Sequence, residues 1–459
     1  MRRTLLIGLS GAALVCCAPA AAQPVIVLDG SRVVTRDEPL GPLADLPPGP
    51  PATASSARTA SSRRARGVAR ARAATSARHS AAAAALRRLR ARGAISAADY
   101  AHYAGSLAGA RAALRRLSGT RHAELASVLG LVDGIAARGS LTASRLRPVF
   151  LTLDRNVQWW TQGRLLSDGD RVSFAGSQIV FQYYAGYGLQ LQMLGNWGKV
   201  NALYFSSQDT ALRGLVNELV PLAAQRGGAI AWEYYFTFDG GTPPWTSGLS
   251  QGTAVEGLAR SAQELSDPSL EAVMRKALGL FTQPAPVGVK DARPHGNHYL
   301  IYSFAPHYHV INAFIQALNG LWDSQALTGD ARAKRLFHLG DLEARYELPY
   351  YDLGDWTRYS NASEQSTPSY GGLLRDFLRG LCERTGTREY CRYADRFSRY
   401  LIGRLGHDLP SQTTGVRKAT PAPGPTPPGP TSPGPGSSPG GGATPGGPRA
   451  APRAAGASG

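Results

Sequence analysis

The sequence predicts a mainly α-helical protein, an incomplete α/α toroid of helical hairpins with a small β insert, preceded by a helical neck. Three observations predict this fold. Apolar residues recur at helical spacing along residues 188–404, in segments that are separated by short polar breaks. Ala- and Leu-rich segments, separated by Gly-containing breaks, occupy residues 79–160. The aromatic run AWEYYFTF, followed by GGTPP, predicts a strand and turn.

The chain begins with a predicted cleavable signal peptide, residues 1–23. It has a basic start, an apolar stretch of signal-peptide length and small residues around Ala20–Ala22. We expect the mature chain to begin near Gln23, and lipid attachment at Cys16 or Cys17 is the alternative. No other segment has the ~20 consecutive apolar residues that span a membrane. We therefore expect a secreted or envelope protein without a transmembrane helix in its mature chain.

The remaining chain divides into four predicted parts. Residues 24–78 open with a short apolar piece and pass into a Pro-, Ala- and Arg-rich linker with too little apolar bulk to fold. Residues 79–160 form the helical neck, with three or four helices. Residues 161–408 form the main helical domain. Residues 409–459 are so rich in Pro and Gly that they predict a disordered tail.

The predicted helices of the main domain are spaced as hairpins. In the fifth helix, apolar residues from Ile311 to Trp322 repeat every three and four positions and give one face for burial. Asp330 is a plausible N-cap for the next helix. The predicted ranges are Gly188–Leu203, Asp209–Gln225, Gln251–Leu265, Pro268–Phe281, Val310–Gln325, Asp330–Tyr346, Tyr370–Arg384 and Tyr390–Arg404.

The formal net charge of +18 lies mainly in the terminal arms. Residues 1–150 are rich in Arg, and residues 409–459 carry basic but no acidic side chains, which leaves residues 151–408 close to neutral. Net charge therefore gives no support for a polyanion-binding central domain. We expect the arms to contact acidic envelope polymers or lipid headgroups, and we expect no nucleic-acid partner because export is predicted.

Two cysteines remain after removal of the signal peptide. Cys382 and Cys391 lie close together in the sequence of a protein predicted to enter an oxidising compartment, which favours a disulfide. Two buried free thiols are the alternative.

Two familiar motifs are weak here. Gly248-Leu-Ser250-Gln-Gly252 fits the serine-hydrolase elbow, but the preceding TPPWTS is not a buried strand, so a helix N-terminus is the better interpretation. Four histidines, His295, His298, His307 and His309, have spacings that can chelate zinc. No thiolate or acid in the same segment completes a site, so we expect structural or solvent-facing histidines and no metal or cofactor.

Tyrosines form four clusters in predicted loops and helix starts: FQYYAGYGLQ, AWEYYF, HYLIY and LPYYDLGDWTRYS. One such cluster is usually packing, because tyrosine combines an apolar ring with a polar tip. Four clusters around one groove of a toroid favour stacking against sugar rings. Packing at the rim is the alternative.

From about Gln182 to Arg384 the chain resembles the C-terminal catalytic domain of the D-glucuronyl C5-epimerases. Four blocks carry the resemblance, in the family's order: YYAGYGLQ, WTSGLSQGTAVEGLARSAQ, YSFAPHYHVINAFIQALNGLWD and LPYYDLGDWTRYS. The family inverts carbon 5 of glucuronic acid units in polysaccharides of the heparosan and heparan type. The resemblance implies a glycosaminoglycan-like or other uronic-acid polysaccharide as partner and an isomerase activity.

The resemblance also implies site residues. Tyr302, Tyr359 and Tyr370 match the tyrosines that the family uses in catalysis. The family's glutamate, arginine and histidine near these tyrosines are replaced by Ile301, Ala362 and Gly371. Candidate substrate-binding residues are Tyr184, Tyr187, Glu233, Gln251 and Arg358; Glu233 would supply the missing carboxylate and Arg358 the missing cation.

The chemistry of such a site follows from the substrate. The hydrogen on carbon 5 is acidified only by the adjacent carboxylate, so the site must neutralise that charge and stabilise an enolate-like intermediate. Inversion needs an acid or base on each face of the ring. Two alternatives stay open at this point: a uronate lyase, which eliminates across carbons 4 and 5 after the same proton abstraction, and a non-catalytic glycan-binding module.

Overall fold

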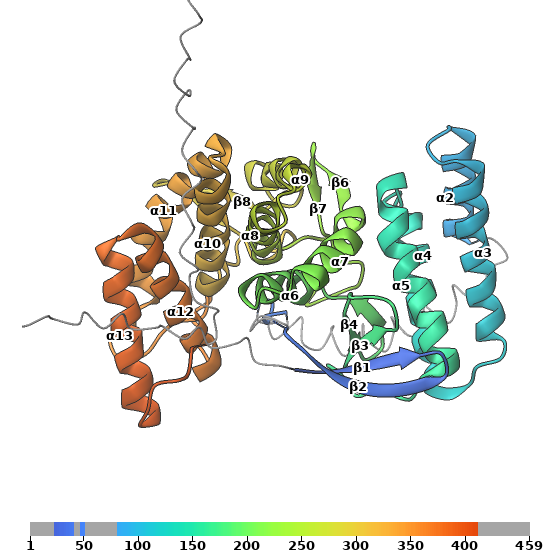
Figure 1. Ribbon diagram of the computed structural model, residues 1–459, viewed down its shortest axis with the longest axis horizontal. Helices are drawn as coiled ribbons and strands as arrows, with labels where there is room; N and C mark the ends of the chain where they lie inside the picture. The colour runs from blue at the N-terminus through green and yellow to red at the C-terminus, as the bar shows by residue number, and fades with distance from the viewer. Residues whose placement is uncertain (1–22, 41–45, 51–79, 412–459) are drawn as a thin grey trace, which may run out of the picture. The chain divides into compact units, whose positions relative to one another are not determined.

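The computed structural model describes residues 23–40, 46–50 and 80–411. The signal peptide, most of the linker and nearly all of the Pro/Gly-rich tail lie outside these residues. The predicted fold class is confirmed, because the described chain is mainly helical with small sheets (Figure 1). Each helix of the main domain that is predicted from Asp209 onward is present, with ends shifted by a few residues.

Four helices form the neck that precedes the main domain. Ser80 and Ser96 cap the first two helices, and each side chain accepts a hydrogen bond from a backbone N–H in the first turn. Buried Leu and Ala side chains fill the spaces between the helices. Their bounds are α2 Ala81–Ala91, α3 Ala97–Leu114, α4 Gly119–Ala137 and α5 Ala143–Gln162.

The main domain consists of four successive helical hairpins. Each hairpin has an inner helix and an outer helix, and the inner helices α6, α8, α10 and α12 pack side by side in that order (Figure 1). Asp330 caps α11 as predicted, accepting hydrogen bonds from two backbone N–H groups. The pairs are α6 Met193–Phe205 with α7 Asp209–Leu219, α8 Gly248–Glu264 with α9 Pro268–Leu278, α10 Ile311–Thr328 with α11 Ala331–Tyr351, and α12 Pro368–Thr385 with α13 Arg388–Leu405.

A five-stranded sheet corrects two predictions. Residues 24–38, predicted as the start of a linker, form two strands together with Gln23, and β1 pairs in parallel with β3, far along the chain. Gly188–Leu191, predicted as helix, forms the strand β5, and helix α6 begins only at Met193. The sheet order is β2-β1-β3-β4-β5, with β1 Gln23–Asp29, β2 Arg32–Glu38, β3 Arg171–Phe174, β4 Phe181–Tyr184 and β5 Gly188–Leu191.

Two short hairpins precede inner helices. Strands β6 (Ala224–Arg226) and β7 (Ala229–Ala231) lead into the aromatic insert, where backbone bridges join Tyr234 to Trp245. Strands β8 (Lys290–Ala292) and β9 (Asn297–Tyr299) precede α10. The predicted strand over AWEYYFTF is therefore wrong: only Ala231 of this run lies in β7, and its aromatic residues form an irregular loop that is held by isolated bridges.

The segments before the inner helices bind one another. The N–H of Ser303, before α10, donates to the carbonyl of Thr246, before α8, at 2.9 Å. Val310, before α10, forms a backbone bridge with Ser360, which precedes α12. The loops at the N-terminal ends of these helices are therefore gathered at one end of the hairpin array.

A buried charge network joins the inner helices nearer their other ends. Arg260 of α8 binds Asp323 of α10 at 2.6 Å, and Arg384 of α12 binds Asp323 at 2.7 Å. Glu256 of α8 binds Arg260 at 2.8 Å and accepts a hydrogen bond from Asn201 of α6. Burial alone would raise the pKa of Asp323, but Arg384 and Arg260 hold it at about 2. The two acids and two arginines balance each other.

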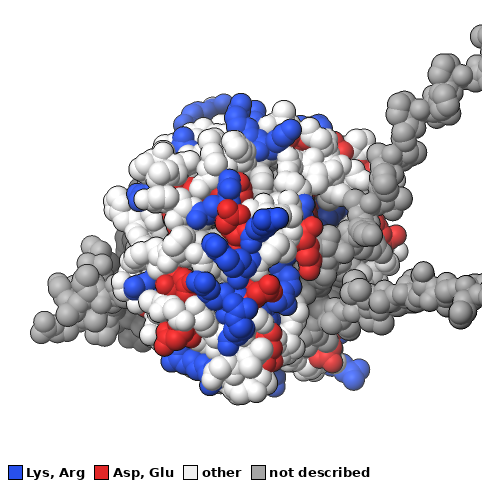
Figure 2. All heavy atoms as spheres, turned by 90° about the vertical axis from the view of Figure 1, so that its left-hand side faces the viewer, with Lys and Arg blue, Asp and Glu red and all other residues white. Residues whose placement is uncertain are grey.

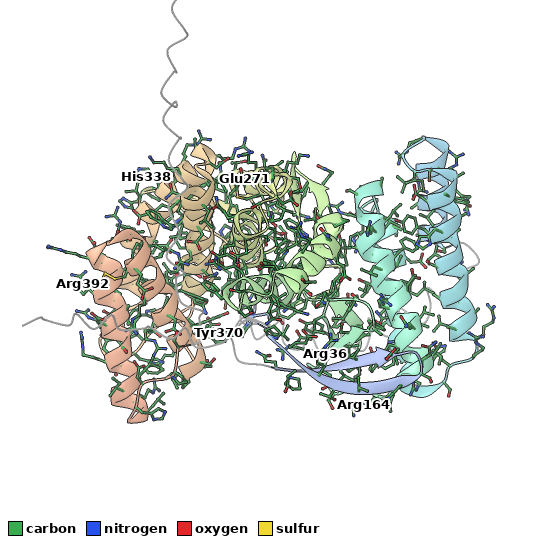
Figure 3. The ribbon with its side chains drawn as sticks, in the orientation of Figure 1. Arg36, Arg164, Glu271, His338, Tyr370 and Arg392 are labelled. Carbon is green, nitrogen blue, oxygen red and sulfur yellow. A yellow bond between two sulfur atoms is a disulfide. The ribbon has the colours of Figure 1, made fainter. Side chains whose placement is uncertain are left out.

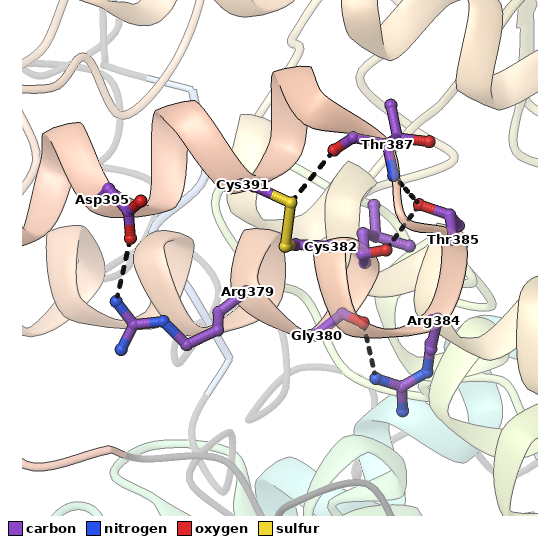
Figure 4. The surroundings of a disulfide bond; sticks show 9 residues. Arg379, Gly380, Cys382, Arg384, Thr385, Thr387, Cys391 and Asp395 are labelled. Atoms are coloured by element: carbon purple, nitrogen blue, oxygen red, sulfur yellow. Dashed lines mark hydrogen bonds and ion pairs between the residues drawn. A yellow bond between two sulfur atoms is a disulfide. The ribbon is translucent and has the colours of Figure 1, made fainter.

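A disulfide between Cys382 and Cys391 joins α12 to α13, as predicted (Figure 4). Arg379 of α12 and Asp395 of α13 approach within 3.8 Å on the exposed side of the same hairpin. On the face shown in Figure 2, basic and acidic side chains are interspersed. Within the described residues, every helix is too short or too polar to cross a membrane.

Asp323→Asn tests the charge network. Removing one partner leaves buried arginines uncompensated, so the free energy of unfolding should fall by about 3–5 kcal/mol in urea denaturation. The contribution of Asp323 should be present above its unfolded pKa of ~3.9 and be lost as the pH falls to about 2, because its folded pKa is depressed. Glu271→Gln is the control, since its partner Arg275 is half exposed and such pairs contribute only ~0–1 kcal/mol. Equal effects of the two substitutions would contradict the assignment.

Gly320→Ala tests the close approach of α8 and α10. A Cβ at Gly320 would collide with the carbonyl oxygen of Gly252, and a Cβ at Gly252 would lie 2.7 Å from the Cα of Ala317. Gly320→Ala should therefore lower the free energy of unfolding by about 1–3 kcal/mol. Gly403→Ala, on α13 with no atom within 4 Å of the added Cβ, should raise it by about 0.5–1 kcal/mol. Stabilisation by both substitutions would show that the helices are not in contact there.

Candidate functional site

The loops before the inner helices carry aromatic side chains that gather near one another. Trp245 lies before α8, and Tyr302 and Phe304 lie before α10. The Trp245 ring contacts both, with centroid distances of 5.5 Å to Tyr302 and 5.3 Å to Phe304. Tyr359 lies before α12 and contacts Tyr370, with ring centroids 5.0 Å apart. Tyr370 is in the first turn of α12 and is labelled in Figure 3.

The structure brings the three candidate catalytic tyrosines together. The ring contact joins Tyr359 to Tyr370, and the hydrogen bonds of two hydroxyl groups bring Tyr302 to Tyr359. The hydroxyl of Tyr302 donates to the carbonyl of Pro47, and the hydroxyl of Tyr359 donates to the carbonyl of Pro48 at 3.2 Å. Because these carbonyls belong to consecutive residues, the two phenol hydroxyls converge on one short segment of the chain.

The segment that supplies these carbonyls, Leu46–Pro50, is called the strap below. Besides the two tyrosine bonds, the N–H of Gly49 donates to Asp239 at 2.7 Å. Gly49 is required there, because an added Cβ would lie 2.5 Å from the Cβ of Asp239. The strap therefore covers the phenol hydroxyls of Tyr302 and Tyr359.

The environment of the phenols favours their protonated form. Burial raises the pKa of Tyr302 well above its usual value, and Tyr359, Tyr234, Tyr370 and Asp239 raise it further. Burial also raises the pKa of Tyr359, followed by its neighbours Tyr308, Tyr370, Glu364 and Asp239. A phenol with a raised pKa keeps its proton at neutral pH, so it can donate a hydrogen bond or a proton.

Two carboxylates near the phenols were not singled out from the sequence. Asp239 is exposed in the turn of the aromatic insert and binds the strap. Glu364 accepts a hydrogen bond from Ser360, next to Tyr359. No sequence motif marks either residue. Both come near the phenols because of the turns of two loops that lie far apart in the sequence.

Tyr184 and Tyr187 form the other side of the aromatic cluster. Both rings pack on Phe236, with centroids at 4.6 and 6.1 Å, and Phe236 contacts Trp245. Their turn is held by Glu124 of α4, which accepts the N–H groups of Gly186 and Gly188. Both tyrosines are half-buried, so each keeps a surface that a ligand can reach.

Glu233 does not supply a free carboxylate. Its side chain is fully buried, and its oxygens bind Arg145 and Arg226, each at 2.6 Å. The hydroxyl of Tyr235 also donates to it, at 3.2 Å. Two arginines neutralise this carboxylate, which ties α5 and the β6–β7 hairpin to the insert.

Gln251 and Arg358 also point elsewhere. The Gln251 side chain is buried and donates to the carbonyls of Ile230 and Ala277, at 3.0 and 3.1 Å, so it cross-links β7 to α9 instead of facing a ligand. The guanidinium of Arg358 donates to the carbonyl of Tyr350 and lies over the Tyr350 ring. Neither side chain contacts the hydroxyls of Tyr302 and Tyr359.

The residues of the two weak motifs, Ser250 and the four histidines, differ in their burial. Ser250 lies in the first turn of α8, buried, and shares a 2.6 Å hydrogen bond with the hydroxyl of Tyr234. His295 and His307 are exposed, whereas His298 and His309 are buried. Burial lowers the pKa of His298 to about 3 and that of His309 to about 4, so both imidazoles are neutral at pH 7.

Residues 226–399 match the family described as D-glucuronyl C5-epimerase C-terminus. This match confirms the predicted family resemblance for three of its four blocks, and the first block, YYAGYGLQ, lies outside the matched range. The matched range contains Tyr302, Tyr359, Tyr370 and Asp239, but it excludes the strap, the neck and the five-stranded sheet.

Other similarities are more distant. An uncharacterized protein of Methanocaldococcus jannaschii is 27% identical over 173 residues, which cover 36% of this chain and 56% of that protein. The chain thus spans little more than half the length of this relative. A cellobiose 2-epimerase of Spirochaeta thermophila is similar with 17% identity and a TM-score of 0.37, covering 57% of this chain and 70% of that one. An endo-β-1,4-glucanase of Acetobacter xylinum is similar with 9% identity and a TM-score of 0.33, covering 45% and 72%.

Proposed function

We propose that the protein is a uronosyl C5-epimerase that acts on a uronic-acid-containing polysaccharide by removing and returning the proton on carbon 5. The observation that carries this proposal is the convergence of the Tyr302 and Tyr359 hydroxyls on two consecutive carbonyls. The family match over residues 226–399 supports the reaction class. The proposed substrate is a chain that contains uronic acid units.

The reaction needs one group to take the proton and one to return it. Removal of the carbon 5 proton leaves an electron pair that moves into the adjacent carboxylate as an enolate, and return of a proton to the opposite face inverts the centre; no other bond breaks. Protonated phenols suit the second step and the stabilisation of the enolate oxygens. Tyr302 and Tyr359, with Tyr370 beside them, are assigned to proton return and to the stabilisation of the enolate oxygens. The carboxylate of Asp239, which interacts with both phenols, is assigned to take the carbon 5 proton.

The strap holds the place that a substrate would take. Its two carbonyls accept the same phenol hydrogen bonds that the oxygens of a uronate would accept. Tyr184 and Tyr187 present half-buried rings on the adjoining side of the cluster, where sugar rings can stack. Substrate binding in this proposal therefore requires the strap to move away.

The remaining parts of the proposal come from the sequence. The protein is assigned to the cell envelope or the exterior, through a cleavable signal peptide, and its basic arms are assigned to acidic envelope polymers. No cofactor is needed for proton transfer at carbon 5. Two outcomes other than epimerisation are distinguished by experiment: a lyase would release an unsaturated uronate that absorbs in the ultraviolet, and a binding module would retain glycan without exchange.

Tyr302→Phe tests the assigned chemistry. The ring contacts with Trp245 and Phe304 remain, but the hydroxyl is lost, so exchange of the carbon 5 hydrogen for deuterium in heavy water should slow by ~10²- to 10⁴-fold. Tyr346→Phe is the matched control, because Tyr346 is 61% exposed on α11, and it should leave the rate unchanged. Unaltered exchange in Tyr302→Phe would remove this tyrosine from the mechanism.

Gly49→Ala tests the role of the strap. The added Cβ would collide with Asp239, so the strap should detach, and the KM for a uronate polymer should fall while kcat stays the same. Gly105→Ala, whose Cβ would meet no atom within 4 Å, is the control. A higher KM in Gly49→Ala would show that the strap helps to bind substrate instead of competing with it.

A further inference from the structure

A second cluster of chemically active side chains lies outside the tyrosine site. His298 is in β9, His309 lies just before α10, and Glu347 is near the end of α11. Each offers one nitrogen or oxygen atom that can bind a metal ion, and these three atoms all lie within 4.8 Å of one another. Three separate elements thus bring two imidazoles and a carboxylate to one point.

The cluster is shielded from solvent. The exposed fractions of the His298, His309 and Glu347 side chains are 0%, 8% and 11%. The Nδ1 atom of His298 lies 2.9 Å from a Glu347 oxygen, and the two imidazole rings stack with centroids 4.2 Å apart. Because buried imidazoles and carboxylates are costly without partners, such a concentration needs a compensating interaction.

Acidic groups outnumber cations around this cluster. The Nε2 atom of His309 is hydrogen-bonded to Asp291 at 2.8 Å, and Glu343 is hydrogen-bonded to Glu347. Within the described residues, Arg293 forms ion pairs with two of these acids, at 3.8 Å from Asp291 and 4.0 Å from Glu343. In addition, His298 Nε2 and Glu343 Oε2 are buried without a hydrogen-bond partner.

We propose that His298, His309 and Glu347 bind one divalent transition-metal ion of the Zn²⁺ class. Two imidazole nitrogens and a carboxylate oxygen are a ligand set that suits this class, with bonds of ~2.0–2.2 Å. Tetrahedral geometry at these lengths separates ligand atoms by ~3.3 Å, so the 2.9 Å contact of His298 with Glu347 opens by only a few tenths of an ångström. Asp291 orients the His309 ring, as a carboxylate behind a metal-bound histidine does.

The proposed ion would be structural and would stabilise the loop that carries Tyr359. The backbone N–H of His309 donates to the Asn361 side chain at 2.9 Å, and its carbonyl accepts the N–H of Asn361 at 3.0 Å. Asn361 lies two residues after Tyr359. The ion would thus join β9, the start of α10 and the end of α11, and it would hold the loop that carries Tyr359.

The test uses the full chain purified without chelators. Elemental analysis should find about one Zn²⁺ per chain, chelation should lower Tm, and added Zn²⁺ should restore it, whereas Mg²⁺ should not. Replacement by Co²⁺ should produce the visible absorption band of a four-coordinate site. A wild-type chain that binds neither Zn²⁺ nor Co²⁺ saturably would overturn the proposal, and an uncompensated hydrogen-bonded cluster would then be the correct description.

Matched variants locate the site. Glu347→Gln and His309→Gln should weaken Co²⁺ binding by at least ~10-fold, and His307→Gln, exposed on the same segment, should not. Equal loss in His307→Gln would mean that surface histidines bind the ion and would overturn the assignment. If the ligand variants do not fold, the Co²⁺ spectrum of the wild-type chain decides the question alone.

Discussion

The structure depends on one buried charge network that fixes the register of the inner helices. Glu256 and Arg260 on α8, Asp323 on α10 and Arg384 on α12 form two acids and two arginines that neutralise one another. A buried charge without its partner is strongly unfavourable, so these helices cannot slide past one another without losing the network. At the same contact, Gly252 and Gly320 allow the backbones of α8 and α10 to meet.

This register decides where the loops before the helices come together. With the network nearer the C-terminal ends, the loops that carry Trp245, Tyr302 and Tyr359 are held at the N-terminal ends, where backbone bonds join one loop to the next. The tyrosine cluster therefore rests on rigid helices although its members lie on loops. Burial and neighbouring acids keep its phenols protonated, which favours hydrogen-bond donation and proton return over proton removal.

The helices could be predicted from the sequence because their signal is local: apolar periodicity, the cap Asp330 and Gly after the last turn. The first strands could not, since β1 pairs with β3 across the whole neck, and Gly188–Leu191 was wrongly assigned to a helix because a short apolar strand has no distinctive period. The convergence of Tyr302, Tyr359 and Tyr370 followed from family motifs. Gln251 lay in one of these motifs and Glu233 in the aromatic run AWEYYFTF, but their side chains bind partners that only tertiary packing brings near. Glu347, Asp239 and the strap were missed for the same reason.

The strap connects the phenols of Tyr302 and Tyr359 to Asp239, because its carbonyls accept the two phenol hydrogen bonds and the N–H of Gly49 donates to Asp239. The most direct measurement is a crystal structure of the full chain with a bound uronate oligosaccharide. We predict that Leu46–Pro50 is displaced and that the hydroxyls of Tyr302 and Tyr359 lie within hydrogen-bonding reach of one uronate ring, close to carbon 5 and its carboxylate. An oligosaccharide bound elsewhere, with the strap still on both tyrosines, would contradict the proposed active site.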